Sequence, residues 1–410
     1  MNRADDFAAV ERLAERLWQV TTERISLEHG GERVCRSEVV ADRDSPAADV
    51  SAMDGFALRL ADIAVGREIP VIAQSVPGQA PPPAPPEGSA VMIFTGAVVP
   101  HGCDLVVRRE EVYEIVDPAG GADGARGIAR AIRFSGDAYR AGENIRRRGE
   151  NAKCGAAVLR SGMLLHAGRI AAAANFGAAS VEVARRVRVR LIITGNELRS
   201  VREGVQSWEI RDSNGQTLQS LLSRHAWIEV LQSTRCGDDL EHLAAEIGDA
   251  ASDADAVILT GGVSQGDFDF VPAAIRRAGG EIVFHKLPIR PGKPICGGLG
   301  SEGQLILGLP GNPVSVAVGA VRFAIPLLRR IAGIVPWQPS VPSVVLGDPL
   351  PRKLSLHWFP LVTLSAQGQG ELVPSQGSGD VVALAHSDGF VGIEPEAEGT
   401  GPWPYWSWEG

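Results

Sequence analysis

Residues 257–270, VILTGGVSQGDFDF, carry the signals that decide the fold. The apolar run VILT leads into two glycines, Gly261 and Gly262, and acidic residues follow shortly afterwards. A short apolar run before a glycine-rich turn is typical of a buried strand, and helical spacing resumes after Phe270. The segment therefore predicts a strand, a loop whose backbone approaches a ligand closely, and a helix.

The surrounding region alternates between strand-like and helix-like patterns. Strands are predicted at 187–194, 227–233, 255–260, 281–287 and 304–310, and helices at 213–225, 238–251, 270–279 and 313–333. Such alternation predicts right-handed crossovers and a parallel sheet with helices on both faces. Ligands of these sheets bind where the carboxyl ends of the strands run into loops.

The flanking regions predict further domains. Apolar residues at helical spacing predict a helix near residues 7–17, residues 34–145 have a β-rich texture, and short β-like runs return after residue 335. We expect an α/β multidomain protein with a central three-layer α/β/α domain. Its predicted parts are a helical segment at 1–38 plus 150–184, a β-rich inserted domain at 39–149, the α/β/α domain at 185–335 and a β-barrel-like domain at 336–410.

Composition narrows the functional class. The chain has 410 residues and a formal net charge of −9, which argues against broad binding of nucleic acid. Five scattered cysteines form no CxxC pair, so we expect reduced thiols and no zinc site. No signal peptide is recognisable and no apolar run approaches the ~20 residues that cross a bilayer. A cytoplasmic protein with no membrane partner is the expectation.

Three glycine-rich segments follow predicted strands. Any one of them is also explained as a tight turn between a strand and a helix. Three at neighbouring strand ends favour a phosphate-bearing ligand, because glycine lets backbone N–H groups converge on an anion. The residues concerned are Thr194 and Gly195; Gly261, Gly262, Val263 and Ser264; and Pro310, Gly311, Asn312 and Ser315.

Carboxylates lie in the same predicted loops and helix starts. They are Glu197, Asp212, Asp238, Asp239, Asp267 and Asp269. Helix capping is one explanation, especially for Asp212 and Asp238. The alternative is a hard cation such as Mg²⁺, which commonly bridges one or two carboxylates and the phosphates of a substrate.

A basic loop follows in HKLPIRPGKP, residues 285–294. Lys286, Arg290 and Lys293 stand among prolines and a glycine, which predicts a stiff anion clamp, although a solvated basic turn has the same composition. His285 is interpreted as structural. Earlier in the chain, SAMDGFA contains Asp54, IFTGA contains Thr95, and NIRRRGEN covers residues 144–151. Each of these could be a turn or a solvated charge run when taken alone.

Together these motifs resemble those of the molybdopterin molybdenumtransferase family, which is related to the C-terminal domain of gephyrin. The matching segments are SAMDGFA, TGAVVPHGCDLVV, NIRRRGE, TGNEL, IRDSN, TGGVSQGDFDF, KLPIRPGKP and GLPGNPVS. The resemblance implies a homodimer whose central domain resembles molybdopterin adenylyltransferase. It also implies that adenylylated molybdopterin and molybdate react, with Mg²⁺ and release of AMP, to give molybdenum cofactor.

The same resemblance implies roles for individual residues. Catalytic roles fall to Asp54, Thr95, Glu197, Asp239, Asp269, Lys286 and Arg290. Pterin and phosphate contacts fall to Thr194, Gly195, Gly261, Gly262, Val263, Ser264, Lys293, Pro310, Gly311, Asn312 and Ser315. Asp239 and Asp269 are candidate metal ligands, and Asp54 and Thr95 are expected to reach the site from the partner subunit. Molybdopterin adenylyltransferase and recipient molybdoenzymes are candidate partners.

The chain departs from the family pattern at three positions. Asn196 and Asn151 stand where the family often has acids, and Arg290 stands where lysine is common. The two asparagines leave a second interpretation open, a non-catalytic paralogue that binds or delivers molybdopterin or the finished cofactor. The aromatic tail, GPWPYWSWEG at 401–410, is expected either to pack on the C-terminal domain or to meet a partner.

Overall fold

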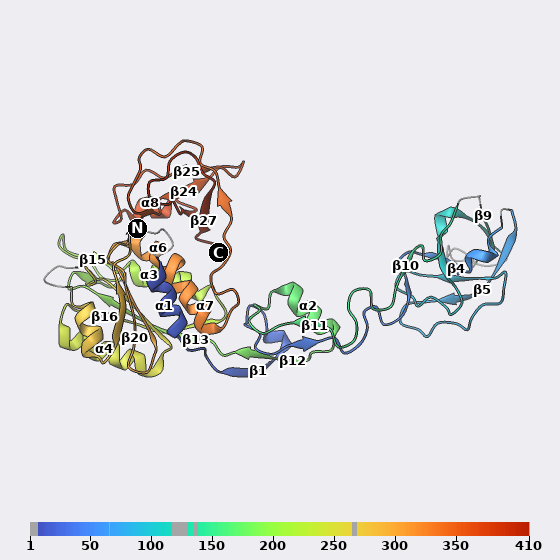
Figure 1. Ribbon diagram of the computed structural model, residues 1–410, viewed down its shortest axis with the longest axis horizontal. Coiled ribbons are helices and arrows are strands. Elements are labelled where there is room, and N and C mark those ends of the chain that lie inside the picture. The colour runs from blue at the N-terminus through green and yellow to red at the C-terminus, as the bar shows by residue number, and fades with distance from the viewer. Residues whose placement is uncertain (1–6, 65, 117–128, 135–137, 265–268, 410) are drawn as a thin grey trace. The chain divides into compact units, whose positions relative to one another are not determined.

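The computed structural model describes residues 7–64, 66–116, 129–134, 138–264 and 269–409. The chain forms two compact units (Figure 1). Unit 1 comprises Met1–Ser37, Arg160–Ala171 and Ala179–Gly410, and unit 2 comprises Glu38–Leu159 and Ala172–Ala178. Unit 2 is thus inserted into unit 1. The finer four-part division given above stays a prediction.

A six-stranded sheet forms the centre of unit 1. Its order is β16 (Ile228–Cys236), β13 (Val187–Thr194), β17 (Ala256–Thr260), β21 (Leu305–Leu309), β20 (Cys296–Leu299) and β18 (Glu281–His285). The first four strands are parallel to one another, whereas β20 is antiparallel to both of its neighbours.

The expectation of an all-parallel sheet is therefore wrong at β20. The sequence of this strand, CGGL, lacks the apolar pattern of a strand because its two glycines make room for neighbours. A Cβ on Gly297 would lie 2.3 Å from the Phe284 ring, and one on Gly298 would lie 2.1 Å from the carbonyl oxygen of Glu281. Close packing of β20 against β18 thus requires glycine at positions where a buried strand usually has apolar side chains, so the sequence of β20 does not predict a strand.

Helices cover both faces of this sheet, as the alternation predicted. Ile258 and its neighbours on one face pack with α3 (Asn214–Ser223), α6 (Pro313–Gly319), α7 (Ile325–Ala332) and α1 (Ala8–Arg16). Val257 and Leu259 point to the other face, against α4 (Leu240–Asp253) and α5 (Val271–Arg277). The helix predicted at 313–333 is confirmed, and it comprises α6, a π-helical turn at Ala320–Ala324, and α7 without a break. The three-layer α/β/α domain is confirmed.

The C-terminal part of unit 1 is a curled five-stranded sheet. Its order is β22 (Ser343–Val344), β27 (Trp403–Ser407), β26 (Gly389–Val391), β24 (Leu361–Leu364) and β25 (Gly370–Leu372), and α8 (Val381–Ala385) lies beside it. A bridge between Leu346 and Gly370 joins the two ends of the sheet, as a barrel requires. The aromatic tail belongs to this sheet, since Trp406 stacks on Phe390 with ring centroids 5.2 Å apart.

Unit 2 is β-rich. Its six-stranded sheet has the order β7 (Leu105–Arg108), β4 (Gly55–Leu58), β6 (Ala90–Ile93), β5 (Glu68–Ser75), β9 (Ala129–Phe134) and β8 (Val112–Val116). The core of this sheet includes Phe56, Leu58 and Ile132, all fully buried. Short pairs flank it: β3 (Val50–Ser51) with β10 (Ile145–Arg146), and β2 (Val39–Val40) with β11 (Ala157–Leu159).

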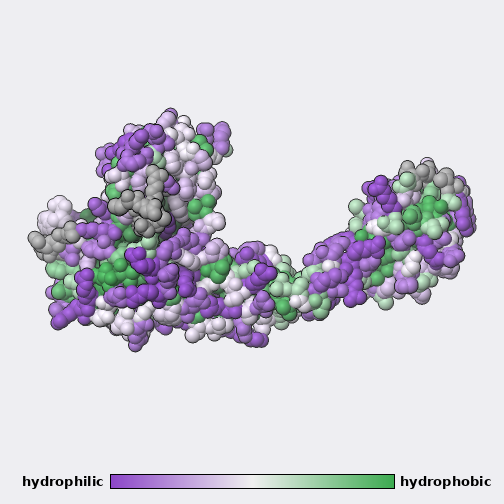
Figure 2. Space-filling model, in the orientation of Figure 1, coloured by the Kyte–Doolittle hydropathy of each residue, from purple (hydrophilic) through white to green (hydrophobic). Residues whose placement is uncertain are grey.

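The remaining elements are short. They are β1 (Thr22–Ser26) paired with β12 (Ser180–Ala184), α2 (Ala167–Asn175), β14 (Leu198–Arg199) paired with β15 (Ile210–Arg211), β19 (Ile289–Arg290) paired with β23 (His357–Trp358), and 3₁₀ turns at Leu27–His29, Leu60–Asp62 and Arg109–Glu111. Among the described residues, no helix is long and apolar enough to cross a membrane. Figure 2 shows small hydrophobic areas distributed among hydrophilic ones on the visible face.

Candidate functional site

The carboxyl ends of four parallel strands lie at one edge of the central sheet. Thr194 at the end of β13 stands opposite Cys236 at the end of β16, and Thr260 at the end of β17 stands opposite Leu309 at the end of β21. All three glycine-rich loops leave from this edge. In doubly wound sheets this is the edge at which ligands bind.

The three loops are in direct contact. The Thr194 hydroxyl donates to the carbonyl of Thr260 at 3.0 Å, and the Gly261 N–H donates to the carbonyl of Leu309 at 3.0 Å. A Cβ on Gly311 would lie 3.5 Å from the Cα of Gly261, and we call this approach the Gly261–Gly311 contact. The three bends therefore lie side by side at this edge, and their convergence on one ligand stays a prediction.

Packing and backbone conformation explain the glycines at the centre of this contact. Gly261 and Gly262 have φ values of +88° and +60°, in the left-handed region that disfavours other residues. A Cβ on Gly261 would also lie 2.6 Å from the Thr194 hydroxyl oxygen. Within this segment, Val263 is buried and Ser264 is exposed, while Gly266 and Asp267 lie outside the described residues.

The third glycine-rich loop, which contains Pro310, Gly311 and Asn312, is held by side chains from α3 and from the loop before α8. The Asn214 amide donates through Nδ2 to the carbonyl of Gly311 at 2.7 Å, and the Asn312 amide donates to the Ser378 hydroxyl at 2.8 Å. Pro310 and Ser315 are buried next to this loop. Asn214 was not predicted as a site residue. Its place in the first turn of a helix gives no sequence signal that its amide bonds to a loop about a hundred residues away.

The carboxylates at this edge are mostly engaged in local hydrogen bonds. Asp239 caps α4 by accepting from the His242 N–H at 2.8 Å, so the capping residue is Asp239 and the prediction for Asp238 is wrong. Asp238 instead exchanges two hydrogen bonds with Asn196, at 3.2 and 3.3 Å. The cap falls on the residue whose backbone is extended directly before the first helical turn.

Glu197 lies close to Gly195, and Asp212 is an N-terminal anchor of α3. A Cβ on Gly195 would lie 2.7 Å from Oε2 of Glu197. The Asp212 carboxylate accepts from the Gly215 N–H at 2.8 Å, as its capping interpretation predicted. Asp269 is half-buried at the start of the segment that leads into α5. Across the part of the chain that the structure describes, no three His, Cys, Asp or Glu side chains form a metal-holding group.

The basic loop lies between α6 and the C-terminal sheet. Lys286 has a φ of +75°, an unusual value for a residue with a side chain, and its N–H donates to the carbonyl of Ile295 at 2.8 Å. Strand β19, which contains Arg290, pairs with β23 of the C-terminal part. A Cβ on Gly292 would lie 4.0 Å from the carbonyl oxygen of Ser315, so the loop lies against α6. Arg290 and Lys293 are exposed.

His285 connects this loop to the second glycine-rich loop. Its Nε2 lies 2.7 Å from the carbonyl oxygen of Val263. This bond gives His285 a positioning function, in keeping with its structural interpretation. The strained conformation of Lys286 next to it costs roughly 1–3 kcal/mol in general, and such residues cluster at functional sites.

In unit 2, Asp54 and Thr95 form a compact exposed pair. The Thr95 backbone N–H donates to the Asp54 carboxylate at 2.7 Å, and the Thr95 hydroxyl donates to the same oxygen at 2.8 Å. The backbone bond, then the hydroxyl, and also the charge of Arg109 lower the pKa of Asp54 below its usual range. The two motifs singled out in the sequence therefore meet, and they hold an ionised carboxylate at the surface of unit 2.

The arginine run of unit 2 is neutralised locally. Arg146 contacts Glu150 and Asn151, Arg147 contacts Asp49, and Arg148 contacts Asp44. These bonds favour the solvated-charge interpretation of this segment. Asn151 has a clear function there, since its side-chain oxygen accepts from Arg146 at 2.8 Å.

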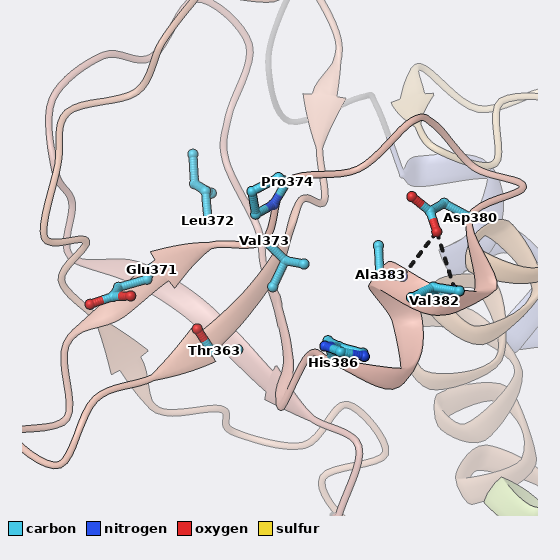
Figure 3. A pocket seen from close by; sticks show the side chains of 9 residues that line it. All are labelled: Thr363, Glu371, Leu372, Val373, Pro374, Asp380, Val382, Ala383 and His386. Carbon is cyan, nitrogen blue, oxygen red and sulfur yellow. Dashed lines mark hydrogen bonds between the residues drawn. The ribbon is translucent and has the colours of Figure 1, made fainter.

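A pocket of about 390 Å³ lies in the C-terminal sheet and not at the strand ends (Figure 3). Its walls include Val373, Val382 and His386, and Asp380 beside them caps α8 by accepting from two backbone N–H groups. The loop before Asp380 carries Ser378, the partner of Asn312. This segment therefore connects the wall of the pocket with the third loop.

Known proteins are similar to this chain over most of its length. Residues 7–177 match the MoeA N-terminal region (domain I and II), and residues 190–330 match the probable molybdopterin binding domain. The chain is 32% identical over 396 residues to a molybdopterin molybdenumtransferase of Haemophilus influenzae, covering 95% of this chain and 94% of that protein. It is 34% identical over 394 residues to the enzyme of the same name from Synechococcus elongatus, covering 93% of each.

Solved structures show the same fold. The molybdopterin biosynthesis MoeA protein from Pyrococcus horikoshii superposes with a TM-score of 0.77 at 24% sequence identity, covering 98% of this chain and 96% of that chain. At this level of identity the likeness concerns the fold alone. The multidomain α/β architecture expected from the sequence is confirmed.

Proposed function

The chain belongs to the molybdopterin molybdenumtransferase family, and from this premise we propose that it inserts molybdenum from molybdate into adenylylated molybdopterin and releases AMP. The broader statement, that it is a transferase of molybdenum cofactor biosynthesis, follows from the family. Our proposal goes further than this statement, because it includes the release of AMP, the participation of Mg²⁺ and the roles of individual residues.

The observation that carries the proposal is the contact among three glycine-rich loops at one sheet edge. Gly261 and Gly311 approach each other closely. The Thr194 hydroxyl joins the first loop to the second by donating to the backbone carbonyl of Thr260. A surface of closely spaced backbone groups suits a ligand that carries phosphates. In our proposal the loop residues named from the sequence bind the pterin and its phosphate.

The basic loop supplies the positive charge that the reaction needs. Cleavage of a phosphoanhydride requires positioning and charge neutralisation more than covalent chemistry, so no nucleophilic side chain is assigned. We assign Lys286, Arg290 and Lys293 to the anionic groups, that is, the phosphates and molybdate. Strain at Lys286 is consistent with a preorganised cation.

The donors at this edge fit Mg²⁺ only as an ion shared with the substrate. Asp239 uses Oδ1 in capping α4, and no group of three protein ligands exists among the described residues. Mg²⁺ commonly takes one or two carboxylates together with phosphate oxygens and water. We propose Asp239 and Asp269 as its protein contacts. When bound, the ion would neutralise charge on the phosphates of the substrate.

We further propose that a second copy of the chain completes the site. Asp54 and Thr95 belong to unit 2, and Glu197 belongs to unit 1. The exposed, ionised Asp54 is suited to contact a cationic or metal-bound group. The five cysteines are free thiols, which suits the reducing cytoplasm as the location of the enzyme. We propose molybdopterin adenylyltransferase and recipient molybdoenzymes as its partners.

The direct test is AMP release from adenylylated molybdopterin in the presence of molybdate and Mg²⁺. Turnover that requires all three components supports the proposal. Tight binding of molybdopterin without turnover would establish the binding or delivery paralogue instead. The structure gives both asparagines that motivated this alternative a local function, because Asn196 pairs with Asp238 and Asn151 accepts from Arg146.

A further inference from the structure

Two buried polar atoms beside the Gly261–Gly311 contact have no hydrogen-bond partner among the described residues. They are Oδ1 of Asn214 and Oγ1 of Thr260, and these residues are only 7% and 1% exposed. Most buried polar atoms in proteins are paired, because an unpaired one carries the full cost of its desolvation. Two at one loop cluster therefore require an explanation.

Both side chains lie on the same face of the sheet. Along β17, Ala256 and Ile258 pack in the core that contains Leu218 and Leu222 of α3, whereas Val257 and Leu259 pack on the opposite face. Since side chains alternate along a strand, Thr260 points to the α3 face. Asn214 is the first residue of α3 and approaches from that side.

Hydrogen bonds determine the direction of each group. The Nδ2 of Asn214 donates to the carbonyl of Gly311 at 2.7 Å, and Oδ1 of the same amide is the atom left without a partner among the described residues. The backbone carbonyl of Thr260 accepts from the Thr194 hydroxyl at 3.0 Å, whereas the side-chain hydroxyl of Thr260 has no partner among the described residues. The pair thus offers one acceptor and one hydroxyl donor.

We propose that Asn214 and Thr260 are specificity-determining residues that recognise the N–H and C=O groups of the pterin ring. This inference rests on the function proposed above. An amide oxygen is an acceptor and disfavours phosphate or molybdate, whereas a pterin presents an amide N–H beside a carbonyl. The acceptor of Asn214 therefore matches the N–H, and the hydroxyl of Thr260 matches the carbonyl.

The burial of both atoms adds an energetic consequence. Because both atoms are buried, a ligand reaches them only when the structure around them opens. Unsatisfied polar atoms destabilise the closed arrangement, so they lower the cost of that opening. Binding then supplies the missing hydrogen bonds, which is a gain that only a ligand with the correct donor and acceptor obtains.

The test uses Thr260→Val, which removes the hydroxyl and preserves the shape, with Thr260→Ser as the matched control. Binding of molybdopterin and of AMP alone is measured anaerobically by calorimetry on the full chain, together with thermal unfolding. We expect Thr260→Val to bind molybdopterin about tenfold more weakly and AMP equally well. Its unfolding temperature should be equal to or above that of the wild type, and Thr260→Ser should restore the affinity.

Asn214→Ala provides the second variant, and it should also weaken molybdopterin binding selectively over AMP binding. Wild-type affinity in Thr260→Val would refute the proposal. A lower unfolding temperature in Thr260→Val, with both ligands weakened, would also refute it, because it would show that the hydroxyl serves the folded state. If the wild-type chain itself fails to bind molybdopterin, the proposed function has failed, and that result is distinct from an effect of either variant.

Discussion

The left-handed backbone of Lys286 allows its functional and structural effects to be separated. Both Lys286→Ala and Lys286→Gly remove the ammonium group from the basic loop. They keep the backbone N–H that donates to Ile295. If this lysine holds an anionic group of the substrate, both variants should lose molybdenum transfer. Their stabilities, however, should differ.

The expected difference follows from the φ value of +75°. A residue with a Cβ loses about 1–2 kcal/mol in the left-handed region, whereas glycine avoids that loss. Glycine loses roughly 0.5–1 kcal/mol more than alanine through chain entropy on folding. The balance favours Lys286→Gly over Lys286→Ala by about 0.5–1 kcal/mol. With a urea slope of roughly 3 kcal/mol per M, the midpoint for unit 1 should differ by about 0.2–0.3 M.

The assay pairs urea unfolding with AMP release, and Lys293 is the matched control. Lys293 lies in the same loop and does not have a positive φ, so Lys293→Gly should be less stable than Lys293→Ala. Equal midpoints for the two Lys286 variants would refute the strain argument. Normal turnover by either Lys286 variant would show that the basic loop does not serve the reaction.

Three further predictions concern charge and assembly. Thr95→Val should raise the pKa of Asp54 measured by NMR titration while leaving it below its usual range, because the stronger backbone bond remains. A carboxyl group with a depressed pKa stabilises the fold above its unfolded pKa, and this stabilisation is lost as the pH falls through its folded pKa. The variant should therefore lose the contribution of Asp54 at a higher pH than the wild type. An unchanged titration of Asp54 would show that the Thr95 hydroxyl does not lower its pKa. Asn196→Asp should place a carboxylate beside Asp238 and make the stability of unit 1 more dependent on Mg²⁺ than in the wild type, and an unaltered Mg²⁺ dependence would exclude an ion near this pair. Mixing inactive Asp54→Ala and Lys286→Ala chains should recover part of the molybdenum transfer, whereas no recovery under conditions that exchange subunits would count against a shared site.

Much of the central fold was predictable from the sequence because the relevant signals are local. Strand β13 coincides with the predicted segment 187–194, and the strand and helix on either side of the Gly261 loop were both expected. A short apolar run bounded by glycine predicts a strand that is buried on both faces of a sheet, and the pattern is complete within a few neighbouring residues. The glycine motifs likewise report backbone conformations that only glycine adopts without strain.

The errors have non-local causes. Strand β20 was missed because Gly297 and Gly298 are required by neighbours in space, Phe284 and Glu281, and not by the strand itself. The helix predicted at 313–333 is present, but apolar periodicity does not reveal its π-helical turn. In the candidate site, Asp238 was expected to cap α4, whereas Asp239 does so. The choice between these neighbours depends on the residue at which the helix begins, and sequence patterns do not locate a helix end to within one residue.

The same distinction applies to polar contacts. Asn214 was missed because its partner, Gly311, is remote in the chain, and the pairing of Asn196 with Asp238 also joins two separate loops. Asp54 and Thr95 were expected to act together only through the family resemblance. Their hydrogen bonds confirm that they meet, whereas their part in the reaction stays a prediction.

A half-buried arginine joins the start of α1 to strand β27 within unit 1. Arg322, in the π-helical turn, lies 5.1 Å from the ring centroid of Phe7 and 5.4 Å from that of Trp406. Trp406 is synthesised almost four hundred residues after Phe7, so this cluster assembles only once strand β27 has been made. Unit 2 is continuous apart from one short segment and can fold while translation proceeds. Nascent chains should therefore show a protease-resistant unit 2 before a resistant unit 1.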